Sequence, residues 1–148
     1  MRIVVQRVTE AKVTVENVTV GQIEAGFMCL VGFNHEDNRD VVDKMVNKLV
    51  HLRIFEDDNE KLNLSLIDVK GGVLSISQFT LYADCKKGRR PSFIDAARPE
   101  AANPLYEYFN EGLRNLGIAV QTGVFGAMMD VSLVNSGPTT IILDSDQL

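Results

Sequence analysis

The sequence predicts a single α+β domain over residues 1–148, built from a mainly antiparallel, barrel-like β-sheet that is backed by two α-helices. Three observations support this class. Strand-like alternation of apolar and polar residues dominates the chain, two segments with helical spacing interrupt it, and no linker, repeat or low-complexity tract divides it. The chain has 148 residues, 45% of them apolar, and a domain of this size buries roughly two-thirds of its unfolded surface.

The first third of the chain has the pattern of strands. Apolar and polar residues alternate over residues 12–15 and again over residues 18–23, and Glu16-Asn17 between them can form a turn. These two segments predict an antiparallel meander. Residues 26–33 are apolar at nearly every position, which predicts a strand that is buried on both faces.

Two segments have helical spacing. Residues 41–52 carry apolar side chains every three or four positions, after a polar run that can supply an N-cap. A second stripe of this kind begins near Pro99 and ends before Gly117, and proline is well tolerated in a first helical turn. We expect both stripes to face the core.

The remaining segments return to strands. Residues 56–60 predict an acidic turn, and residues 73–82 have the β-branched and aromatic composition of a strand. Alternation over residues 129–134 predicts another strand, and residues 139–143 predict the last one. Between these two, residues 135–138 are by themselves typical of a hairpin turn.

The charge of the chain limits its partners. Its formal net charge is −5, so the protein as a whole repels polyanions and any nucleic-acid site must be a local feature. The longest uninterrupted apolar stretch, residues 27–31, is far too short for a membrane span. We expect a soluble, cytoplasmic protein that has neither a membrane nor DNA as a partner. Cys29 lies within the apolar stretch and Cys85 in a polar turn, so we expect neither a disulfide nor a catalytic thiol.

Three segments could carry chemistry. The first is Ser77-Gln78-Phe79-Thr80, where two hydroxyls, a carboxamide and an aromatic ring occupy consecutive positions at the predicted end of a strand. The alternative interpretation is an ordinary strand whose hydroxyls face solvent. The second is residues 135–138, which contain Gly137-Pro138, and no function can be inferred from that pair alone.

The remaining segment, called the basic loop below, consists of Lys86, Lys87, Gly88, Arg89 and Arg90. Its charge is opposite to that of the whole chain. Because salt screens charges beyond roughly 8 Å, a phosphate near this loop would respond to its four cations more than to distant carboxylates. The basic loop is therefore a candidate phosphate-binding element. The alternative interpretation is a solvated surface loop.

No general base accompanies the hydroxyls. The only histidines, His35 and His51, lie outside the three segments, so Ser77 or Thr80 would be a poor nucleophile. No Cys or His pair has zinc spacing, the acidic turn lacks the glycine and later glutamate of a calcium loop, and there is no glycine-rich phosphate loop. We expect no metal and no cofactor.

Taken together, in their order and spacing, these segments resemble the bacterial and eukaryotic D-aminoacyl-tRNA deacylase family. The similarity runs from Met1 to about Leu143. Five motifs carry it: VQRV at 5–8, LRIF at 52–55, SQFTL at 77–81, GRRPSF at 88–93, and VSLVN at 131–135, which leads into Gly137-Pro138.

The resemblance implies a homodimeric editing enzyme that hydrolyses the ester joining a D-amino acid, or glycine, to the terminal adenosine of tRNA. It implies a pocket built around residues 77–80. It also implies that Gly137-Pro138 forms a cis bond and reaches into the partner subunit's pocket. The carbonyl groups of Gly137 and Pro138 would there occupy the space that the side chain of an L-amino acid needs. Selectivity for D-amino acids would therefore come from excluding the L-enantiomer.

The resemblance further implies that the ribose 2′-hydroxyl of the substrate helps to activate water, which would make a protein base unnecessary. The protein would then position the ester and stabilise its oxyanion. We expect the backbone N–H groups of Phe79 and Thr80 to be the donors, supported by Ser77 and Gln78.

Other residues have weaker assignments. Arg7 is a candidate brace for the Gly137-Pro138 segment and Met129 a candidate pocket residue, although either could equally be structural. The cations of the basic loop could hold acceptor-stem phosphates. Two other functions stay open: a non-catalytic RNA-binding module, and a small-ester hydrolase with Thr80 or Ser77 as its nucleophile.

Overall fold

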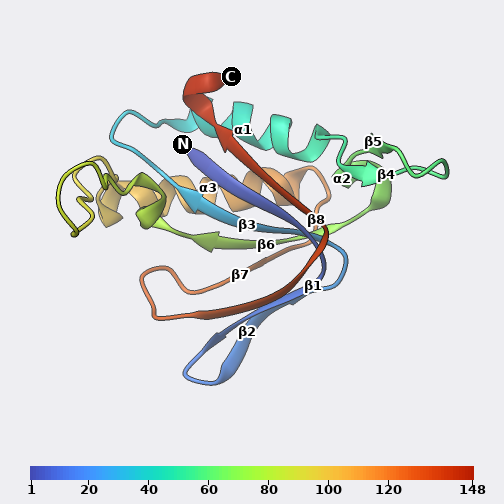
Figure 1. The fold of residues 1–148 in the computed structure, drawn as a ribbon, viewed down its shortest axis with the longest axis horizontal. Coiled ribbons are helices and arrows are strands. Elements are labelled where there is room, and N and C mark those ends of the chain that lie inside the picture. Colours follow the sequence, from blue (N-terminus) through green and yellow to red (C-terminus); the bar gives the residue numbers. More distant parts are fainter.

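The computed structural model describes all 148 residues. Its main feature is one curved six-stranded sheet in the order β2-β1-β3-β6-β7, with β8 paired along the opposite edge of β1 (Figure 1). The strands of this sheet are β1 (Arg2–Val15), β2 (Val18–Ile23), β3 (Gly26–Gly32), β6 (Gly72–Ser77), β7 (Val120–Thr122) and β8 (Asp130–Asp144). A separate hairpin of β4 (Phe55–Glu56) and β5 (Leu62–Leu64) encloses the predicted acidic turn.

Both predicted helices are present. They are α1 (Arg39–His51) and α3 (Pro99–Asn115), which lie together on one side of the sheet (Figure 1). Asn38 caps α1, because its side-chain oxygen accepts a hydrogen bond of 3.0 Å from the Val41 N–H. The shorter elements are α2 (Leu66–Val69) and two 3₁₀ turns, η1 (Phe79–Tyr82) and η2 (Ser145–Gln147). None of the helices has the length and apolar character needed to cross a membrane.

The sheet is mainly antiparallel, as predicted, because β1 pairs in that sense with β2, β3 and β8. Two parallel pairs, β3 with β6 and β6 with β7, extend it. The connections explain this difference, since parallel neighbours need long crossovers and the two long helices lie within these connections. The far edges then approach each other. A Cβ added at Gly21 of β2 would lie 2.7 Å from the carbonyl oxygen of Thr122 in β7, so the sheet is a nearly closed barrel.

Two hydrophobic cores hold this arrangement together. The larger contains 23 buried residues between the sheet and the helices, including Phe27, Met45 and Phe109. The smaller contains seven buried residues, among them Leu74 and Ile76 of β6. Adjacent residues of β6 thus contribute to different cores, since successive side chains of a strand point to opposite faces. Burying each large apolar side chain contributes about 1.5–3 kcal/mol.

The predicted strand over residues 73–82 is wrong in its second half. Strand β6 ends at Ser77, and the chain then turns into η1. The partner strand explains this end: Val31 of β3 pairs with Ser77, and the Gln78 N–H still donates to the Val31 carbonyl at 2.8 Å. Beyond that point β3 offers no further strand residues except Gly32. The carbonyl of Gln78 instead accepts the Leu81 N–H.

The predicted hairpin turn at residues 135–138 is also wrong. Strand β8 continues through these residues and stays paired with β1 on both sides of them. Gln6 pairs with Thr140 and Val8 pairs with Asn135, so β8 places four residues opposite Arg7 alone. This insertion is a large β-bulge, called the β8 bulge below (residues 136–139). A bulge tolerates glycine and proline without reversing the chain.

Candidate active site

A cavity of about 600 Å³ opens at one end of the molecule. In Figure 1 that end carries the loop after β6, the start of α3 and the connection between β7 and β8. Twelve of its 18 lining residues are hydrophobic. The lining consists of residues 31–33, 77–79, 96–99 and 125–129, together with Phe93, Ala102 and Val131. A cavity of this size and character is typical of a small-molecule or substrate pocket.

The walls of this cavity offer no acid or base. None of the lining residues is His, Cys, Asp, Glu, Lys or Tyr, and Arg98 is the only charged one. No cluster of three or more potential metal-ligating side chains is present anywhere in the chain. Apart from Arg98, the polar groups that line the cavity are therefore neutral side chains and backbone. Such a site can position and polarise an ester, but it cannot withdraw a proton from water by itself.

Residues 77–80 meet the cavity at the junction of β6 and η1. Ser77 and Gln78 are half-buried and line the cavity together with Phe79, whereas Thr80 is exposed and lies outside the lining. The Gln78 amide donates a hydrogen bond to the Thr80 hydroxyl, which fixes both side chains. Phe79 and Thr80 begin η1, and the first N–H groups of a helix have no intrahelical acceptor.

Arg2 holds the η1 turn in place, a contact that the sequence analysis did not predict. Its Nη1 donates to the Leu81 carbonyl at 2.9 Å, its Nε donates to Asp144 at 2.9 Å, and its guanidinium lies 4.5 Å from the centre of the Tyr82 ring. The hydrogen bond to Asp144 raises the pKa of Arg2. Burial alone would raise the pKa of Asp144, but hydrogen bonds from Arg2 and the Asp146 N–H hold it below its ordinary value.

The Gly137-Pro138 pair lies in the β8 bulge, and its peptide bond is cis. Both residues are exposed, and neither lines the cavity of its own chain. Gly137 has a φ of +117°, which favours glycine. The side chain of Asn135 closes the bulge, because its oxygen accepts the Thr139 N–H at 2.9 Å and its amide donates to the Thr139 carbonyl at 3.3 Å.

Arg7 connects the β8 bulge to the rest of the fold. Although charged, it is only 7% exposed. Its Nη1 donates to the Ile54 carbonyl at 2.7 Å, its Nε donates to the Ser136 carbonyl at 3.2 Å, and its Nη2 lies 4.0 Å from the Glu56 carboxylate. A Cβ added at Gly137 would lie 2.7 Å from Arg7 Nη2. Arg7 thus joins the β8 bulge to the segment around Ile54, and its role as a brace for Gly137-Pro138 stays a prediction.

The basic loop lies outside the cavity lining, and all four of its cations are exposed. Backbone hydrogen bonds of 2.8 Å in each direction between Asp84 and Ser92 close the loop at its base. Just after it, Phe93 packs edge-on against Phe79, with ring centroids 5.1 Å apart. The loop is thus attached to the rim of the cavity through this aromatic pair.

Met129 lines the cavity and is half-buried, next to the almost fully exposed Met128. It packs so tightly that a Cβ at Gly123 would overlap its sulfur atom. Phe125 of the same connection lines the cavity and contacts the Tyr106 ring at 6.1 Å between centroids. The connection between β7 and β8 therefore forms one wall of the cavity.

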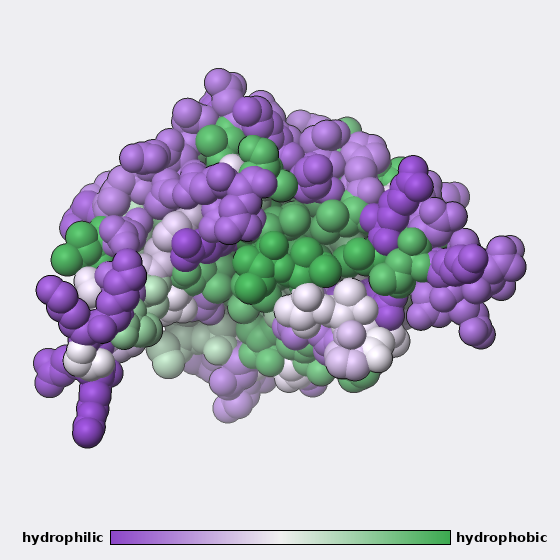
Figure 2. All heavy atoms as spheres, turned by 45° about the horizontal axis from the view of Figure 1, so that its top comes forward, coloured by the Kyte–Doolittle hydropathy of each residue, from purple (hydrophilic) through white to green (hydrophobic).

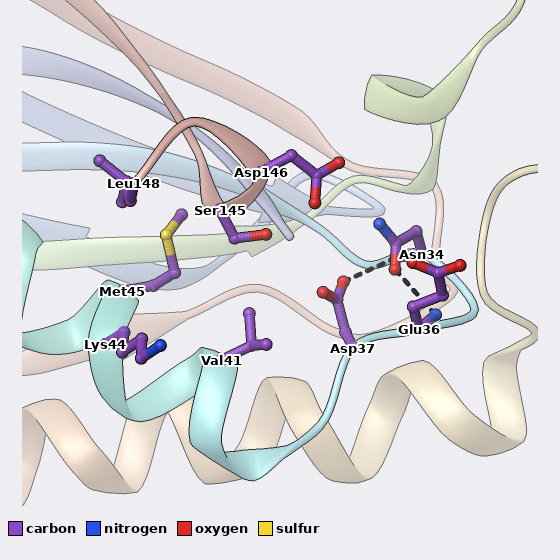
Figure 3. A pocket seen from close by; sticks show the side chains of 9 residues that line it. All are labelled: Asn34, Glu36, Asp37, Val41, Lys44, Met45, Ser145, Asp146 and Leu148. Atoms are coloured by element: carbon purple, nitrogen blue, oxygen red, sulfur yellow. Dashed lines mark hydrogen bonds between the residues drawn. The ribbon is translucent and has the colours of Figure 1, made fainter.

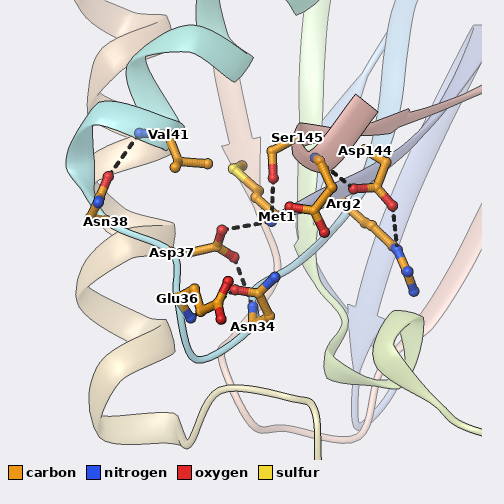
Figure 4. Close-up of polar contacts among 10 residues, drawn as sticks. Met1, Arg2, Asn34, Glu36, Asp37, Asn38, Val41, Asp144 and Ser145 are labelled. Atoms are coloured by element: carbon orange, nitrogen blue, oxygen red, sulfur yellow. Dashed lines mark hydrogen bonds and ion pairs between the residues drawn. The ribbon is translucent and has the colours of Figure 1, made fainter. Parts of the chain in front are cut away.

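A second, smaller cavity of about 160 Å³ lies beside α1 and the C-terminal end (Figure 3). Structural contacts account for several of its polar residues, among them Asn34, Asp37 and Ser145 (Figure 4). The Met1 ammonium is fully buried and pairs with Asp37 at 2.7 Å, and it also donates to the Ser145 hydroxyl at 2.8 Å. The second Asp37 oxygen accepts the Asn34 N–H at 2.7 Å. We therefore place the candidate active site at the large cavity.

Comparisons with known proteins agree with this choice of family. The profile of the D-Tyr-tRNA(Tyr) deacylase family matches residues 4–144. The chain belongs to this family. A D-aminoacyl-tRNA deacylase of Bacillus pumilus is 63% identical over 147 residues, covering 99% of this chain and 100% of the relative. A D-aminoacyl-tRNA deacylase of Thermus aquaticus is 59% identical, covering 99% of this chain and 97% of the relative.

Two solved structures have the same fold. That of c-Myc DNA Unwinding Element Binding Protein has a TM-score of 0.91 and 39% identity, and covers 97% of this chain and 98% of its own. That of a probable eukaryotic D-amino acid tRNA deacylase has a TM-score of 0.82 and 20% identity, with coverage of 96% and 97%. At 20% identity, the second likeness concerns the fold alone.

Several of the cavity's residues escaped the sequence analysis. Phe93, Arg98 and Phe125 line the cavity from segments to which the sequence analysis assigned no functional role. Phe93 belongs to the GRRPSF motif, but no local pattern places any of the three at a pocket, because only the tertiary fold brings residues near 93, 98 and 125 next to Ser77. Conversely, the Gly137-Pro138 pair and the basic loop do not reach this cavity within one chain. The roles assigned to all these residues stay predictions.

Proposed function

We propose that this member of the deacylase family hydrolyses the ester of D-aminoacyl-tRNA to free tRNA and a D-amino acid. The observation that carries the proposal is the apolar cavity with residues 77–79 in its wall and no acid or base around it. The curated relatives at 63% and 59% identity are both called D-aminoacyl-tRNA deacylase. Belonging to that family over nearly its whole length, the chain is a deacylase, which is a hydrolase.

The missing base favours hydrolysis assisted by the substrate. In this reaction a water molecule attacks the ester carbonyl, the bond from that carbon to the ribose oxygen breaks, and the oxygen leaves with a proton. The neighbouring ribose 2′-hydroxyl would orient and activate the water. The backbone N–H groups of Phe79 and Thr80, at the start of η1, would stabilise the oxyanion. Gln78, held by Thr80, and Ser77 would support this geometry.

Selectivity for the D hand would come from Gly137-Pro138 acting on a second copy of the chain. The pair is exposed and does not line its own cavity, so it could only reach the cavity of a partner. Its carbonyl oxygens would exclude an L side chain, whereas a D-amino acid or glycine would escape the clash. By this reasoning glycyl-tRNA(Ala) would be a second substrate. Met129 would line the pocket.

A homodimer would also cover an exposed strand edge. Strand β8 is paired only with β1, which leaves its other edge free over 15 residues. Val134 and Ile142 of this strand are 49% and 68% exposed. Figure 2 shows hydrophobic atoms gathered across the middle of one face, with hydrophilic side chains around them. Free edges and exposed apolar areas of this kind are typical of protein interfaces.

The partner that we propose is the aminoacylated end of tRNA in the cytoplasm. The cations of the basic loop would contact acceptor-stem phosphates, since they are exposed and lie just before the aromatic rim of the cavity. We do not propose DNA as a partner, because the name of the c-Myc DNA Unwinding Element Binding Protein describes that structural relative alone.

The mechanism can be separated from nucleophilic catalysis by hydroxyl variants. Thr80→Ala and Ser77→Ala should each lower the rate of D-tyrosyl-tRNA hydrolysis only modestly, through the lost support of Gln78 and of the ester, because neither hydroxyl forms a covalent bond with the substrate. Rapid acid quenching followed by mass spectrometry should find no acyl-enzyme. An acyl group on either side chain would make the chain a Ser- or Thr-dependent esterase. Binding of the tRNA without any hydrolysis would make it a non-catalytic RNA-binding module.

A further inference from the structure

Arg98 is the only charged side chain that lines the large cavity. It directly precedes α3, and its side chain is 77% exposed. Its Nε donates to the Glu100 carboxylate at 3.0 Å, and that carboxylate is also largely exposed. The two terminal nitrogens of the guanidinium have no hydrogen-bond partner in the chain. Arg98 therefore presents free donors at the mouth of an otherwise uncharged cavity.

The proposed substrate limits what these donors can bind. The aminoacyl group carries a positive ammonium, which a guanidinium repels, and the ester, ribose and adenine are neutral. The nearest anion on an aminoacyl-tRNA is the phosphodiester that joins the terminal adenosine to the preceding nucleotide. Guanidinium groups bind phosphate oxygens in pairs, through parallel hydrogen bonds.

We infer that Arg98 binds the phosphodiester on the 5′ side of the terminal adenosine and so sets how far the RNA end enters the cavity. This inference rests on the proposed function. It assigns a single phosphate to a residue outside the basic loop, and it makes Arg98 a binding residue rather than a catalytic one. Glu100 holds the guanidinium in the free protein and would compete with the phosphate for it.

The rim of the cavity suits the end of an RNA strand. Phe79 and Phe93 line the cavity, are 53% and 39% exposed, and form an edge-on pair with centroids 5.1 Å apart. Exposed aromatic rings of this kind stack readily on unpaired bases. A cation and exposed aromatic rings around one opening are the two elements with which proteins hold single-stranded nucleic acid.

The test combines one substitution in the protein, Arg98→Gln, with one change in the substrate, and it measures KM for all four combinations. The substrates are D-tyrosyl-tRNA with natural linkages and the same molecule with an uncharged methylphosphonate at the last internucleotide linkage. For the wild-type protein, removing this charge should raise KM roughly fivefold, the loss expected for one charge-assisted contact at an exposed site. For Arg98→Gln, the same removal should change KM by less than about twofold, because the contact is already absent.

Two further variants sharpen the result. Glu100→Gln should lower KM for the natural substrate, because it frees the guanidinium. Arg114→Gln is the control, since Arg114 makes an ion pair of equal length, 3.0 Å, with Glu111 at the far end of α3 and does not line the cavity. With Arg114→Gln, removing the phosphate charge should still raise KM about fivefold, as in the wild type. We call this rise in KM the linkage effect. A merely structural role for Arg98 would slow both substrates equally and leave the linkage effect intact.

The inference is overturned if Arg98→Gln and the wild type respond equally to the loss of the phosphate charge, or if neither responds. Failure of the proposed function would look different, because the wild type would then release no amino acid from either substrate. In that case the effect of the phosphate charge can still be measured with the two tRNAs in their non-aminoacylated form, as a change in Kd. The same comparison of Arg98→Gln with the wild type then decides the inference.

Discussion

Replacing Arg7 with methionine tests the link between the β8 bulge and the fold. The substitution keeps an unbranched side chain of similar length and removes two hydrogen bonds, to the carbonyls of Ile54 at 2.7 Å and Ser136 at 3.2 Å. Hydrogen bonds from a charged donor contribute about 1.5–3 kcal/mol each, or about 3–6 kcal/mol for the pair. Removing a buried charge also removes its desolvation cost, so we expect a net loss of about 2–4 kcal/mol in the free energy of unfolding.

The functional effect should be separate from the stability effect. Without Arg7, the Ser136 carbonyl next to Gly137 loses its anchor, and the proposed gate becomes less well placed. A loss of about 1.4 kcal/mol in discrimination would lower the ratio of D- to L-tyrosyl-tRNA hydrolysis about tenfold. Urea unfolding at one fixed protein concentration measures the first effect, and initial rates with both substrates measure the second.

Glu56→Gln provides the control for this prediction. Glu56 lies 4.0 Å from the Arg7 guanidinium and is 53% exposed, so its loss should cost less than about 0.5 kcal/mol and leave the D-to-L ratio unchanged. The reasoning is refuted if Arg7→Met unfolds within about 0.5 kcal/mol of the wild type and keeps the same ratio. A stability loss without a change in the ratio would leave Arg7 structural and remove it from the gate.

Other regions give three more predictions. Changing the four cations of the basic loop to glutamine should lower the slope of log KM against log salt by about 0.7–0.9 for each phosphate that the loop no longer binds, and an unchanged slope would make the loop a solvated surface. Asp37→Asn should destabilise the fold by about 3 kcal/mol in urea, because the buried Met1 ammonium loses its carboxylate; a loss below about 0.5 kcal/mol would contradict this. Asp144, whose pKa is lowered, should stabilise the fold fully above a pH of about 4 and lose this contribution as pH falls through its folded-state pKa. Arg2→Met should weaken that acid dependence, and an identical acid-unfolding curve would refute the assignment.

The two long helices could be predicted because their signals are local. An N-cap at Asn38 and an apolar stripe with a period of 3.6 residues specify α1 without reference to any other segment. The proline at the start of α3 works in the same way. The strand after Gly71-Gly72 was predicted too long, because its end depends on where β3 stops pairing.

The β8 bulge shows why register could not be predicted. Residues 135–138 have the composition of a turn, yet the chain continues because β1 is long enough to pair on both sides of them. The extra residues face Arg7, which is distant in sequence from all of them. A nonlocal pairing thus decides a local conformation, and composition alone contains no information about it.

The candidate site was predictable only in part for the same reason. Residues 77–79 were singled out by their composition and their family motif, and they do line the cavity. Phe93 and Arg98 reach it only because a bridge between Asn34 and Ala96 fixes the segment that precedes α3. Their place at the rim is a property of the tertiary fold.

The central claim is that the chain removes D-amino acids from tRNA, does not hydrolyse L-aminoacyl-tRNA, and needs no metal. Its most direct test is the release of labelled amino acid from matched D-tyrosyl-, L-tyrosyl- and glycyl-tRNA by the purified, metal-stripped protein. The account predicts release from the D ester and the glycyl ester and none from the L ester. Equal release from both tyrosyl esters would indicate a general esterase and contradict the gate, and no release from any ester would contradict the proposed function.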